Sequence, residues 1–443
     1  MLATLTQAAQ WCGGIRWGNG DPILTGVRID SRQVRNGDLF VALPGARTNG
    51  HDFINAATDQ GAAAVMVSLP FNAAHKISVG QLAVCDGAAA LARLASRWRD
   101  KFDGTIIAVT GSNGKTTVKE MLASICRDAA DESSTHRTIG NFNNRLGVSL
   151  TLLELRATHR YAVLETGMDA PGELTELGQM VRPQVAIINN CQRAHIGNFS
   201  SLDDIAAAKG ELITTLPVDG VAVLNAADPY LNMWQQLAGT RQVLTFGFPG
   251  EGADFCGDWD GKHLQLPNGT QVMLRVPGMH NARNALAAAA AAQVLKLPET
   301  AVCTGLESFT GVAGRLRFIH RRQLLIIDDS YNANPDSALA AMAVLSDCDG
   351  EKIAVLGDML ALGKAADAAH RQIIDAAQQA NATVFAVGEH MQAATGSGFS
   401  SKAALLKALN ARLDAAEGQI VVLVKGSRGM KMEDIVSTLE QRS

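Results

Sequence analysis

Between residues 105 and 250 the chain alternates between continuous apolar runs and stretches with helical spacing. TIIAVTG, YAVLETG, VAIINN, VAVLN and VLTFG are runs of the first kind, and such runs are typical of strands that are buried on both faces. After the first run, apolar residues recur at i, i+3, i+4 and i+7, the spacing of one helix face: Val118, Met121, Leu122 and Ile125. This alternation predicts a mostly parallel sheet with helices on both of its faces.

Strand and helix patterns also alternate on either side of this central part. Before it, DLFVALPG, AAAVMVS and QLAVCD predict strands and residues 88–98 predict a helix. Beyond SFTGVAGRLRF, the runs LLIIDDS, KIAVLGDM, TVFAVGE and IVVLVKGS alternate with further helical segments. We therefore predict an α/β protein of three domains: a small N-terminal α/β domain (1–100), a central parallel-sheet domain (101–312) and a Rossmann-like C-terminal α/β domain (313–443).

Composition and charge narrow the class of protein. The net charge is only −4, which gives no indication of a nucleic-acid-binding face. The seven cysteines are scattered without a Cys-x-x-Cys pair, so neither a zinc knuckle nor a disulfide framework is indicated. The N-terminus lacks the pattern of a signal peptide, and the longest apolar stretch, residues 285–294, is too short to span a bilayer. We predict a cytoplasmic protein without a membrane span.

The stretch TGSNGKTT follows the first buried run and opens the predicted helix. Free N–H groups and the helix dipole favour an anion at such a point. Gly111 and Gly114 would let the backbone approach a phosphate. Lys115 can reach outer phosphates, and the Thr116 hydroxyl can bind Mg²⁺. Val109 stands where the usual Gly-x-x-x-x-Gly-Lys-Ser/Thr spacing has its first glycine, which indicates a distinct family of phosphate loops (P-loops).

The loop alone does not name a reaction. An ordinary glycine-rich turn is the structural alternative, and kinases, ATPases, GTPases and ligases all use phosphate loops. Three further residues follow strands or lie in helical segments of the central part. Glu165 can bind Mg²⁺ or cap a helix, His195 can be a ligand or an exposed polar residue, and Lys209 is on its own more typical of a helix surface.

Taken together, these stretches resemble the Mur ligase family, the ATP-dependent amide-forming enzymes of peptidoglycan synthesis. The resemblance rests on TGSNGKTT, TIGNFNN, ETG, AHIGNF and AAAKGE, and it continues in MHNARNALAA, GRLRF and DDSYNANPDS. It also covers VRIDSRQVRNGDLFVALPG in the first domain, so it reaches all three parts of the chain. It implies a central P-loop domain of the ATPase type, with ATP as co-substrate.

The resemblance also implies roles for individual residues. Thr116 and Glu165 would hold one Mg²⁺, and His195 with a carbamylated Lys209 would hold a second, so that Lys115, Lys209 and His195 are the expected catalytic residues. The positions expected to contact ATP are Gly111, Asn113, Gly114, Lys115, Thr116, Thr117, Asn141, Asn284, Arg315 and Asp329. The positions expected to contact the other substrates are Ser31 and Arg32, on the uridine-nucleotide side of the first domain, and Asn143, Asn144, Tyr331, Asn332 and Asn334.

Within the family, GNFNNRLGV, SYNANPDS and VLGDMLALG are similar to the branch that adds D-alanyl-D-alanine to UDP-N-acetylmuramoyl-tripeptide. The resemblance implies an acyl-phosphate intermediate, with the pentapeptide precursor, ADP and phosphate as products, and a monomer acting on small molecules. A ligase that adds a diamino acid and a folate-polyglutamate ligase are the alternatives. One departure is Ala361, which stands in DMLALG where a glutamate is usual.

Overall fold

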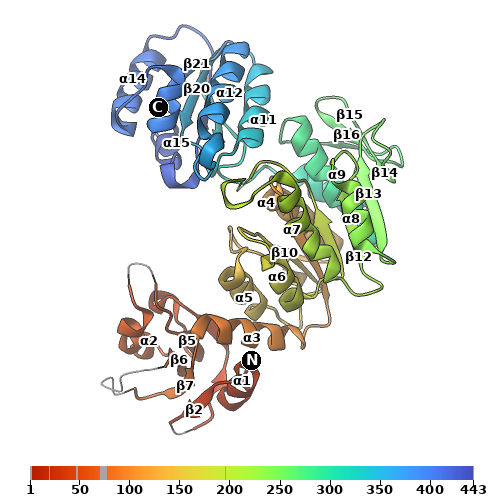
Figure 1. The fold of residues 1–443 in the computed structure, drawn as a ribbon, viewed down its shortest axis with the longest axis vertical. Coiled ribbons are helices and arrows are strands. Elements are labelled where there is room, and N and C mark those ends of the chain that lie inside the picture. Colours follow the sequence, from red (N-terminus) through yellow and green to blue (C-terminus); the bar gives the residue numbers. More distant parts are fainter. Residues whose placement is uncertain (1, 19, 46–47, 70–76, 195, 443) are drawn as a thin grey trace.

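In a computed structural model, the chain is described over residues 2–18, 20–45, 48–69, 77–194 and 196–442. Along these residues, three α/β units follow one another from the lower end of Figure 1 to its upper end. This confirms the predicted α/β fold of three parts. The domain boundaries near residues 100 and 312 stay a prediction.

The N-terminal unit contains a five-stranded sheet. Its strands are β2 (Ile15–Trp17), β4 (Gly26–Arg28), β5 (Asp38–Val41), β6 (Ala64–Ser68) and β7 (Gly80–Val84). They pair in the order β2-β7-β6-β5-β4, with β2 antiparallel to β7 and the other neighbours parallel. The helices are α1 (Leu5–Cys12), α2 (Ile54–Asp59) and α3 (Gly87–Arg99), and a short pair is formed by β1 (Ala3–Thr4) and β3 (Ile23–Leu24).

The central unit contains a seven-stranded sheet in which every neighbouring pair is parallel. Its strands are β8 (Thr105–Thr110), β9 (Thr135–Arg137), β10 (Tyr161–Glu165), β11 (Val185–Ile188), β12 (Val221–Asn225), β13 (Gln242–Gly247) and β14 (Phe255–Cys256). Their order is β14-β13-β12-β11-β8-β10-β9. The helices are α4 (Lys115–Ala129), α5 (Arg145–Leu153), α6 (Glu173–Val181), α7 (Leu202–Thr214), α8 (Leu231–Ala238), α9 (Met279–Val294) and α10 (Glu299–Ser308).

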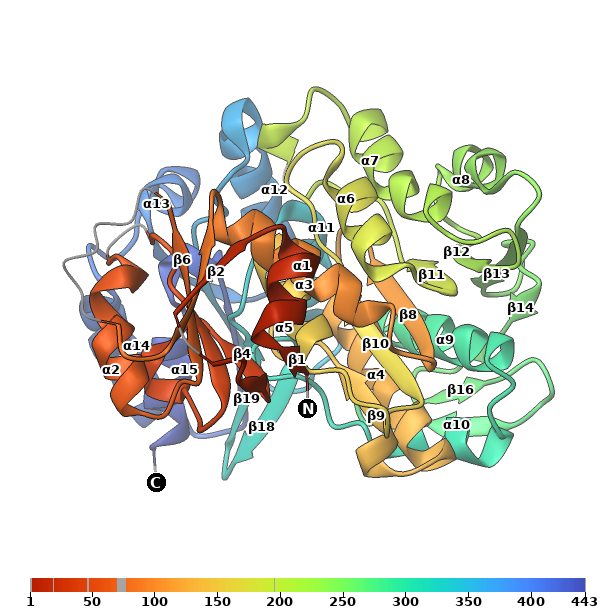
Figure 2. The same ribbon diagram turned by 90° about the horizontal axis from the view of Figure 1, so that it is seen from below.

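Successive residues of the central strands pack on opposite faces of the sheet. Ile106 and Ala108 belong to the core that includes residues of α5, α6 and α7, whereas Ile107 and Val109 pack with α4, α9 and α10. Figure 2 shows these two helix layers on either side of the sheet. Burial on both faces explains why these strands read as continuous apolar runs. Because the strands are parallel, their carboxyl ends meet at one edge of the sheet, where ligands collect in open α/β sheets.

A small antiparallel sheet between β14 and α9 was not among the predicted elements. It consists of β15 (Asp258–Trp259), β16 (His263–Gln265) and β17 (Gln271–Met273). These strands are two or three residues long and partly exposed, so their apolar pattern is weak. The dipeptide Asn268-Gly269 between β16 and β17 is a known hairpin signal and could have revealed part of this sheet.

The C-terminal unit has a five-stranded sheet in the order β18-β19-β22-β20-β21. The strands are β18 (Arg317–Arg321), β19 (Leu324–Asp329), β20 (Glu351–Gly357), β21 (Thr383–Val387) and β22 (Ile420–Lys425). Only β18 pairs antiparallel. The helices are α11 (Pro335–Ser346), α12 (Ala366–Gln379), α13 (Glu389–Thr395), α14 (Lys402–Asp414) and α15 (Glu433–Glu440).

The N-terminal and central units pack against each other along α3. Leu91 and Leu94 of α3 belong to the same buried cluster as Leu152 of α5. Arg99, at the end of α3, donates hydrogen bonds to the carbonyls of Val181 (2.8 Å) and Arg182 (3.0 Å) of the central unit. No helix of the described residues is long and apolar enough to cross a membrane.

Candidate active site

The phosphate loop lies between the end of β8 and the start of α4, as predicted. Gly114 caps α4 with a φ of 81°, and a Cβ there would come within 2.4 Å of both Asn189 Nδ2 and Asn284 Oδ1. The left-handed conformation and the close packing therefore both require glycine. Asn189 Nδ2 donates to the Asn113 carbonyl (2.9 Å) and to Asn284 Oδ1 (2.8 Å). Side chains at the end of β11 and in α9 thus hold the loop in shape.

Lys115 points its amine back over the loop. Its Nζ donates to the carbonyls of Gly111 (2.7 Å) and Ser112 (3.3 Å). Burial lowers the pKa of Lys115, and the nearby Glu165 carboxylate partly offsets this effect. A bound phosphate would favour the charged form of the amine still further. This residue is therefore suited to neutralise charge on a phosphate at the loop.

Thr116 and Glu165 come together, although 49 residues separate them in the sequence. Thr116 Oγ1 donates to Glu165 Oε2 (2.7 Å), and Asn143 Nδ2 donates to Glu165 Oε1 (2.7 Å). Glu165 is only 1% exposed. Its carboxylate bonds to side chains rather than to helix N–H groups, so the helix-capping alternative is wrong.

The Thr116–Glu165 pair fits a magnesium ion. Hydroxyl and carboxylate oxygens are the hard ligands that Mg²⁺ prefers, and one or two carboxylates usually suffice when phosphate oxygens complete the shell. In the described parts of the chain, no group of three His, Cys, Asp or Glu side chains is placed to hold a metal by itself. A metal held here would therefore depend on phosphate oxygens as well as on protein ligands.

Lys209 lies in α7 and is only 3% exposed, so the alternative of a surface lysine is wrong. Burial and the neighbouring Lys115 lower the pKa of Lys209 to about 7. Much of the amine is therefore neutral at pH 7. Within the described residues, Lys209 makes no hydrogen bond or ion pair. Lys209 also lines the cavity, and a lysine with a strongly lowered pKa at such a place is a candidate for chemistry.

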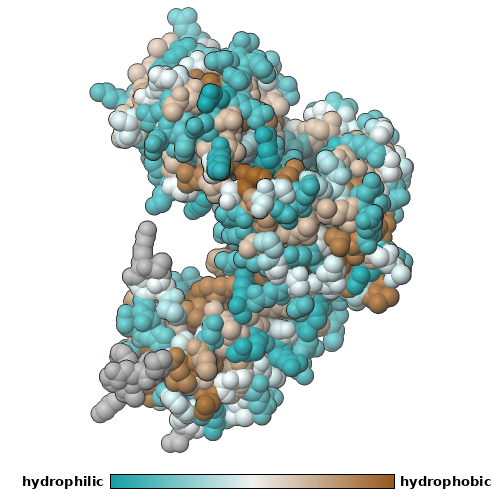
Figure 3. All heavy atoms as spheres, in the orientation of Figure 1, coloured by the Kyte–Doolittle hydropathy of each residue, from teal (hydrophilic) through white to brown (hydrophobic). Residues whose placement is uncertain are grey.

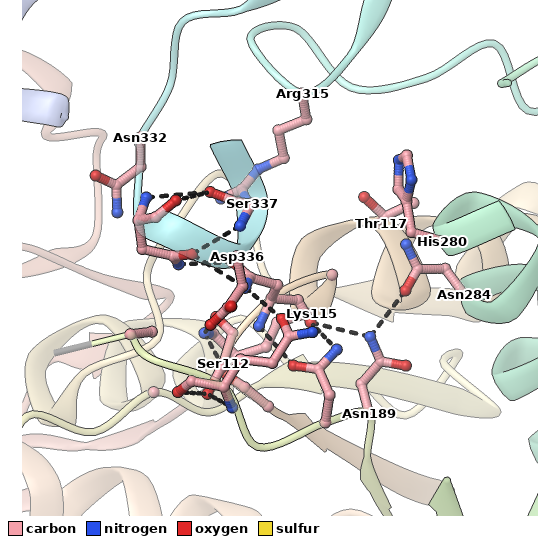
Figure 4. A pocket seen from close by; sticks show the side chains of 18 of the residues that line it. Ser112, Lys115, Thr117, Asn189, His280, Asn284, Arg315, Asn332, Asp336 and Ser337 are labelled. Atoms are coloured by element: carbon pink, nitrogen blue, oxygen red, sulfur yellow. Dashed lines mark hydrogen bonds between the residues drawn. The ribbon is translucent and has the colours of Figure 1, made fainter. Parts of the chain in front are cut away.

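The C-terminal unit contributes a second group of side chains. The Arg315 guanidinium lies over the Tyr331 ring, 4.2 Å from its centroid. Asp329 is paired with Lys425, and its other oxygen accepts from the Leu316 N–H (3.1 Å). Burial raises the pKa of Asp329, an effect that the Lys425 ammonium opposes. The positive charge of Lys425 is thus largely compensated by Asp329. Arg315, in contrast, faces the phosphate loop (Figure 4).

Most of the predicted residues line one cavity of about 1370 Å³ between the central and C-terminal units. Figure 4 shows part of this lining. The predicted residues on its wall are Gly111, Asn113, Gly114, Lys115, Thr117, Asn141, Asn143, Asn144, Glu165, Lys209, Asn284, Arg315, Asp329, Tyr331, Asn332 and Asn334. Thr116 is buried behind Glu165. The cavity therefore brings together side chains that are far apart in the sequence.

Besides Thr116, two of the predicted residues that the structure describes do not line this wall. Ser31 and Arg32 lie in a 3₁₀ turn of the N-terminal unit, where the Arg32 guanidinium pairs with Asp30 (2.7 Å). They are not brought to the cavity, and their predicted contact with the uridine nucleotide stays a prediction. His195 lies outside the described residues.

Some residues of the cavity wall were missed in the sequence. Asp228 follows β12 and accepts from the Cys191 N–H (2.7 Å), and burial raises its pKa. Asp336 also lines the wall, and it forms an ion pair (2.7 Å) with Arg193 of the central unit, which is not itself a lining residue. AADP directly after the strand VAVLN was a signal for Asp228, because polar residues at the carboxyl ends of parallel strands face the ligand edge. Arg193 follows the strand VAIINN in the same way, but nothing in the sequence indicated its partner Asp336 in the C-terminal unit.

Comparison with known proteins gives matches along the whole chain. Three family models match in turn: "Mur ligase family, catalytic domain" over residues 23–99, "Mur ligase middle domain" over 109–292, and "Mur ligase, glutamate ligase domain" over 314–428. The UDP-N-acetylmuramoyl-tripeptide–D-alanyl-D-alanine ligase of Escherichia coli K12 is 39% identical over 99% of this chain and 98% of its own. The ligase of the same name from Haemophilus influenzae is 37% identical, over 94% of this chain and 93% of its own.

Solved structures give the same result. A crystal structure of MurF from Acinetobacter baumannii is 34% identical, with a TM-score of 0.88 and 99% of each chain covered. MurF from Thermotoga maritima, solved in complex with ADP, is 26% identical with a TM-score of 0.81, over 94% of this chain and 97% of its own. Together with the phosphate loop, the buried glutamate and the buried lysine, these matches establish that the chain belongs to the Mur ligase family.

Proposed function

We propose that this chain is an ATP-dependent ligase that joins the amine of D-alanyl-D-alanine to the terminal carboxylate of UDP-N-acetylmuramoyl-tripeptide. Full-length similarity to ligases of that name supports the choice of substrates. The observation that carries the reaction type is the buried Thr116–Glu165 pair beside Lys115 at the phosphate loop. The products would be the UDP-N-acetylmuramoyl-pentapeptide, ADP and phosphate, made by a monomer in the cytoplasm.

A carboxylate is a poor electrophile, so it must be activated before an amine can attack. In the proposed first step, a carboxylate oxygen attacks the γ-phosphorus of ATP, ADP leaves, and an acyl phosphate forms. Lys115 would neutralise the phosphoryl oxygens, while the backbone at Gly114 would hold the phosphates close to the start of α4. Catalysis of this kind depends mainly on alignment and charge.

In the second step, the free amine attacks the acyl carbonyl carbon, the C–N bond forms, phosphate leaves, and the nitrogen gives up a proton. Tyr331 and Asn332 of the C-terminal unit line the same cavity as the phosphate loop, and they would orient the amine substrate. Enclosure between the units would keep water away from the acyl phosphate.

The proposal includes two Mg²⁺ ions, which would neutralise negative charge on the phosphoryl group. Thr116 and Glu165 would hold one ion, and His195 with a carbamylated Lys209 would hold the other. Burial lowers the pKa of the Lys209 amine to about 7, so a substantial fraction is neutral at pH 7, and this neutral nitrogen can attack the carbon of CO₂. An N–C bond forms and the nitrogen gives a proton to water, so that a cation becomes an anion suited to a metal.

The choice of amine can be tested with ADP formation as the readout. The purified chain is given ATP, Mg²⁺ and UDP-N-acetylmuramoyl-tripeptide with D-alanyl-D-alanine, with a diamino acid or with glutamate. We expect ADP and a new amide product with D-alanyl-D-alanine only. Turnover with either of the other amines would favour one of the alternative ligases, and fast ADP formation without any amine would contradict ligase activity.

Lys115→Ala tests the phosphate loop. Loss of the cation should reduce ADP formation by roughly 100-fold or more, as expected when a charge that stabilises the transition state is removed. The circular dichroism spectrum should not change, because the amine contacts only its own loop. Ordinary turnover by the folded variant would refute the proposed role of the loop.

A further inference from the structure

The N-terminus of α11 contacts two loops of the central unit at once. Asn334 caps α11 by accepting from the Ser337 N–H (2.9 Å), and Pro335 occupies the first helical position. The Ser337 hydroxyl in turn accepts from the Asn334 N–H (3.1 Å). This reciprocal capping fixes the first turn of the helix. Side chains that leave this turn are therefore held in a defined direction.

One contact joins α11 to the phosphate loop. Asn334 Nδ2 donates to Asn113 Oδ1 (2.8 Å), and Asn113 Nδ2 lies 3.3 Å from Asn334 Oδ1. Asn113 Nδ2 also donates to Gln192 Oε1 (2.6 Å). The loop that would bind ATP is thus hydrogen-bonded directly to the C-terminal unit, across 221 positions of sequence.

A second contact joins α11 to the loop after β11. The Arg193 guanidinium donates to both oxygens of Asp336, with Nη2 2.7 Å from Oδ1 and Nε 3.3 Å from Oδ2. The Arg193 backbone N–H also donates to Asp336 Oδ2 (2.8 Å). The Asp336 side chain is 22% exposed and that of Arg193 40%, so solvent weakens the pair only in part.

The loop after β11 is tied to the phosphate loop in turn. The Gln192 N–H donates to Ser112 Oγ (2.8 Å), and Ser112 Oγ donates to the Gln192 carbonyl (2.9 Å). Asp336 is therefore linked to Ser112 by its hydrogen bonds with Arg193, by the peptide bond between Arg193 and Gln192, and by the hydrogen bonds of Gln192 with Ser112. In Figure 4, Asp336 and Ser337 lie beside Ser112 and Lys115.

We infer that Asn334 and Asp336 are positioning residues for the reaction: acting through Asn113 and Arg193, they hold the C-terminal unit in register over the phosphate loop. These four residues form the α11 bridge. α11 also lines the cavity, so the bridge fixes the distance between the phosphate and whatever the C-terminal unit binds. The inference rests on the proposed ligase function for its kinetic readout only.

A double-mutant cycle tests the ion pair of the α11 bridge in the full-length chain. Arg193→Ala and Asp336→Asn should each lower kcat by roughly fivefold, the loss expected for a partly exposed charge-assisted pair, while the KM for ATP changes less than about twofold. The double variant should be no slower than the slower single variant, because each residue acts through the other. Independent, multiplicative effects or an unchanged kcat would overturn the inference.

Asn334→Ser tests the amide pair without removing the helix cap, since serine also caps helices well. It should lower kcat to a similar extent, with an unchanged unfolding midpoint. Asp375→Asn, at an exposed position of α12, is the matched control and should leave kcat unchanged. A loss of kcat in Asp375→Asn equal to that in Asp336→Asn would overturn the inference.

Hydrogen exchange tests the α11 bridge independently of the proposed ligase activity. In Arg193→Ala, the amides of the phosphate loop should exchange faster than in the unmodified chain, whether or not the protein ligates any amine. If the unmodified chain forms no ADP with any amine, the proposed function fails while this measurement still decides on the bridge. Unchanged exchange in the phosphate loop would refute it.

Discussion

At the residue scale, the most informative side chain is Lys209, a buried lysine whose amine is partly neutral at neutral pH. Its burial in α7, together with Lys115 nearby, lowers its pKa to about 7. A cation would repel a metal, whereas a carbamate would bind one. The same burial that makes Lys209 unfavourable as a free lysine makes its nitrogen nucleophilic enough to react with CO₂.

Lys209→Ala should therefore lose nearly all activity, and short carboxylic acids such as acetate should restore part of it, because an added carboxylate can occupy the space of the lost carbamate. ADP release is measured with acetate and with chloride at equal ionic strength. Equal recovery with chloride would contradict the carbamate. Lys209→Arg is the matched control: it places a permanent cation at this position, leaves no space for acetate, and should stay inactive when acetate is added.

Ala361 is strained, with a φ of 60° in the left-handed region. Alanine in this conformation costs roughly 1 kcal/mol relative to glycine. Ala361→Gly should therefore raise the urea midpoint of the C-terminal unit, by an amount equivalent to about 0.5–1 kcal/mol. Asn381→Gly, at a φ of 53°, is the comparison and should gain less, because asparagine tolerates this region. A larger gain at Asn381 would contradict the strain argument.

The predictable residues were those whose positions depend on one sheet. Lys115, Thr116 and Glu165 follow neighbouring parallel strands, so their meeting at one edge could be expected from sequence. The ion pair of Arg193 with Asp336 could not, because it depends on how two separately folded units are placed. The contact of Lys425 with Asp329 was also missed, although both end neighbouring strands of one sheet.

At the scale of elements, strand β9 carries His136, whose burial should make the stability of the folded chain depend on pH. His136 Nε2 is 2.9 Å from the Thr151 carbonyl of α5, and its ring stacks on that of His159 at 5.0 Å. Burial lowers the pKa of His136 to about 4 from an ordinary value near 6.5. Between these two values, the unfolded chain binds a proton that the folded chain does not.

Stability should therefore fall as the pH decreases from about 6.5 to about 4, by up to about 1.4 kcal/mol per pH unit for this one group. The free energy of unfolding is measured across this range for the unmodified chain and for His136→Gln, which should show a shallower dependence. The same substitution at His320, exposed on β18, is the control. A slope that is equally steep in both variants would argue against His136 as the source.

The helices and strands that are most deeply buried were the ones that the sequence predicted best. Strands β11 and β22 are buried along their whole length and β8 along all but its first residue, so their continuous apolar runs are easily recognised. The short strands β15, β16 and β17 expose every other residue or more, so little of their sequence reports their structure. The position of a short, half-exposed strand depends mainly on the turns beside it and on the part of the protein against which it packs.

At the scale of the whole molecule, the N-terminal and C-terminal units face each other across open space in Figure 3. The N-terminal unit is fastened to the central one along α3, and the C-terminal unit is joined to it by the α11 bridge. The predicted uridine-binding residues Ser31 and Arg32 do not line the cavity that holds the phosphate loop. A substrate held at both places must therefore span two units.

Reaction requires the attacking oxygen to lie about 3–3.5 Å from phosphorus, and we therefore expect the N-terminal unit to move toward the C-terminal unit when the substrates bind. The radius of gyration from small-angle X-ray scattering should fall toward the ~22 Å expected for a compact chain of this length when a non-hydrolysable ATP analogue and UDP-N-acetylmuramoyl-tripeptide are both added. Lys115→Ala should show a smaller decrease at the same ligand concentrations, because it holds the nucleotide less well. If the radius of the unmodified chain does not change at saturating ligand, the carboxylate reaches the phosphate without closure. The N-terminal unit would then bind its substrate at a face other than the turn that contains Ser31.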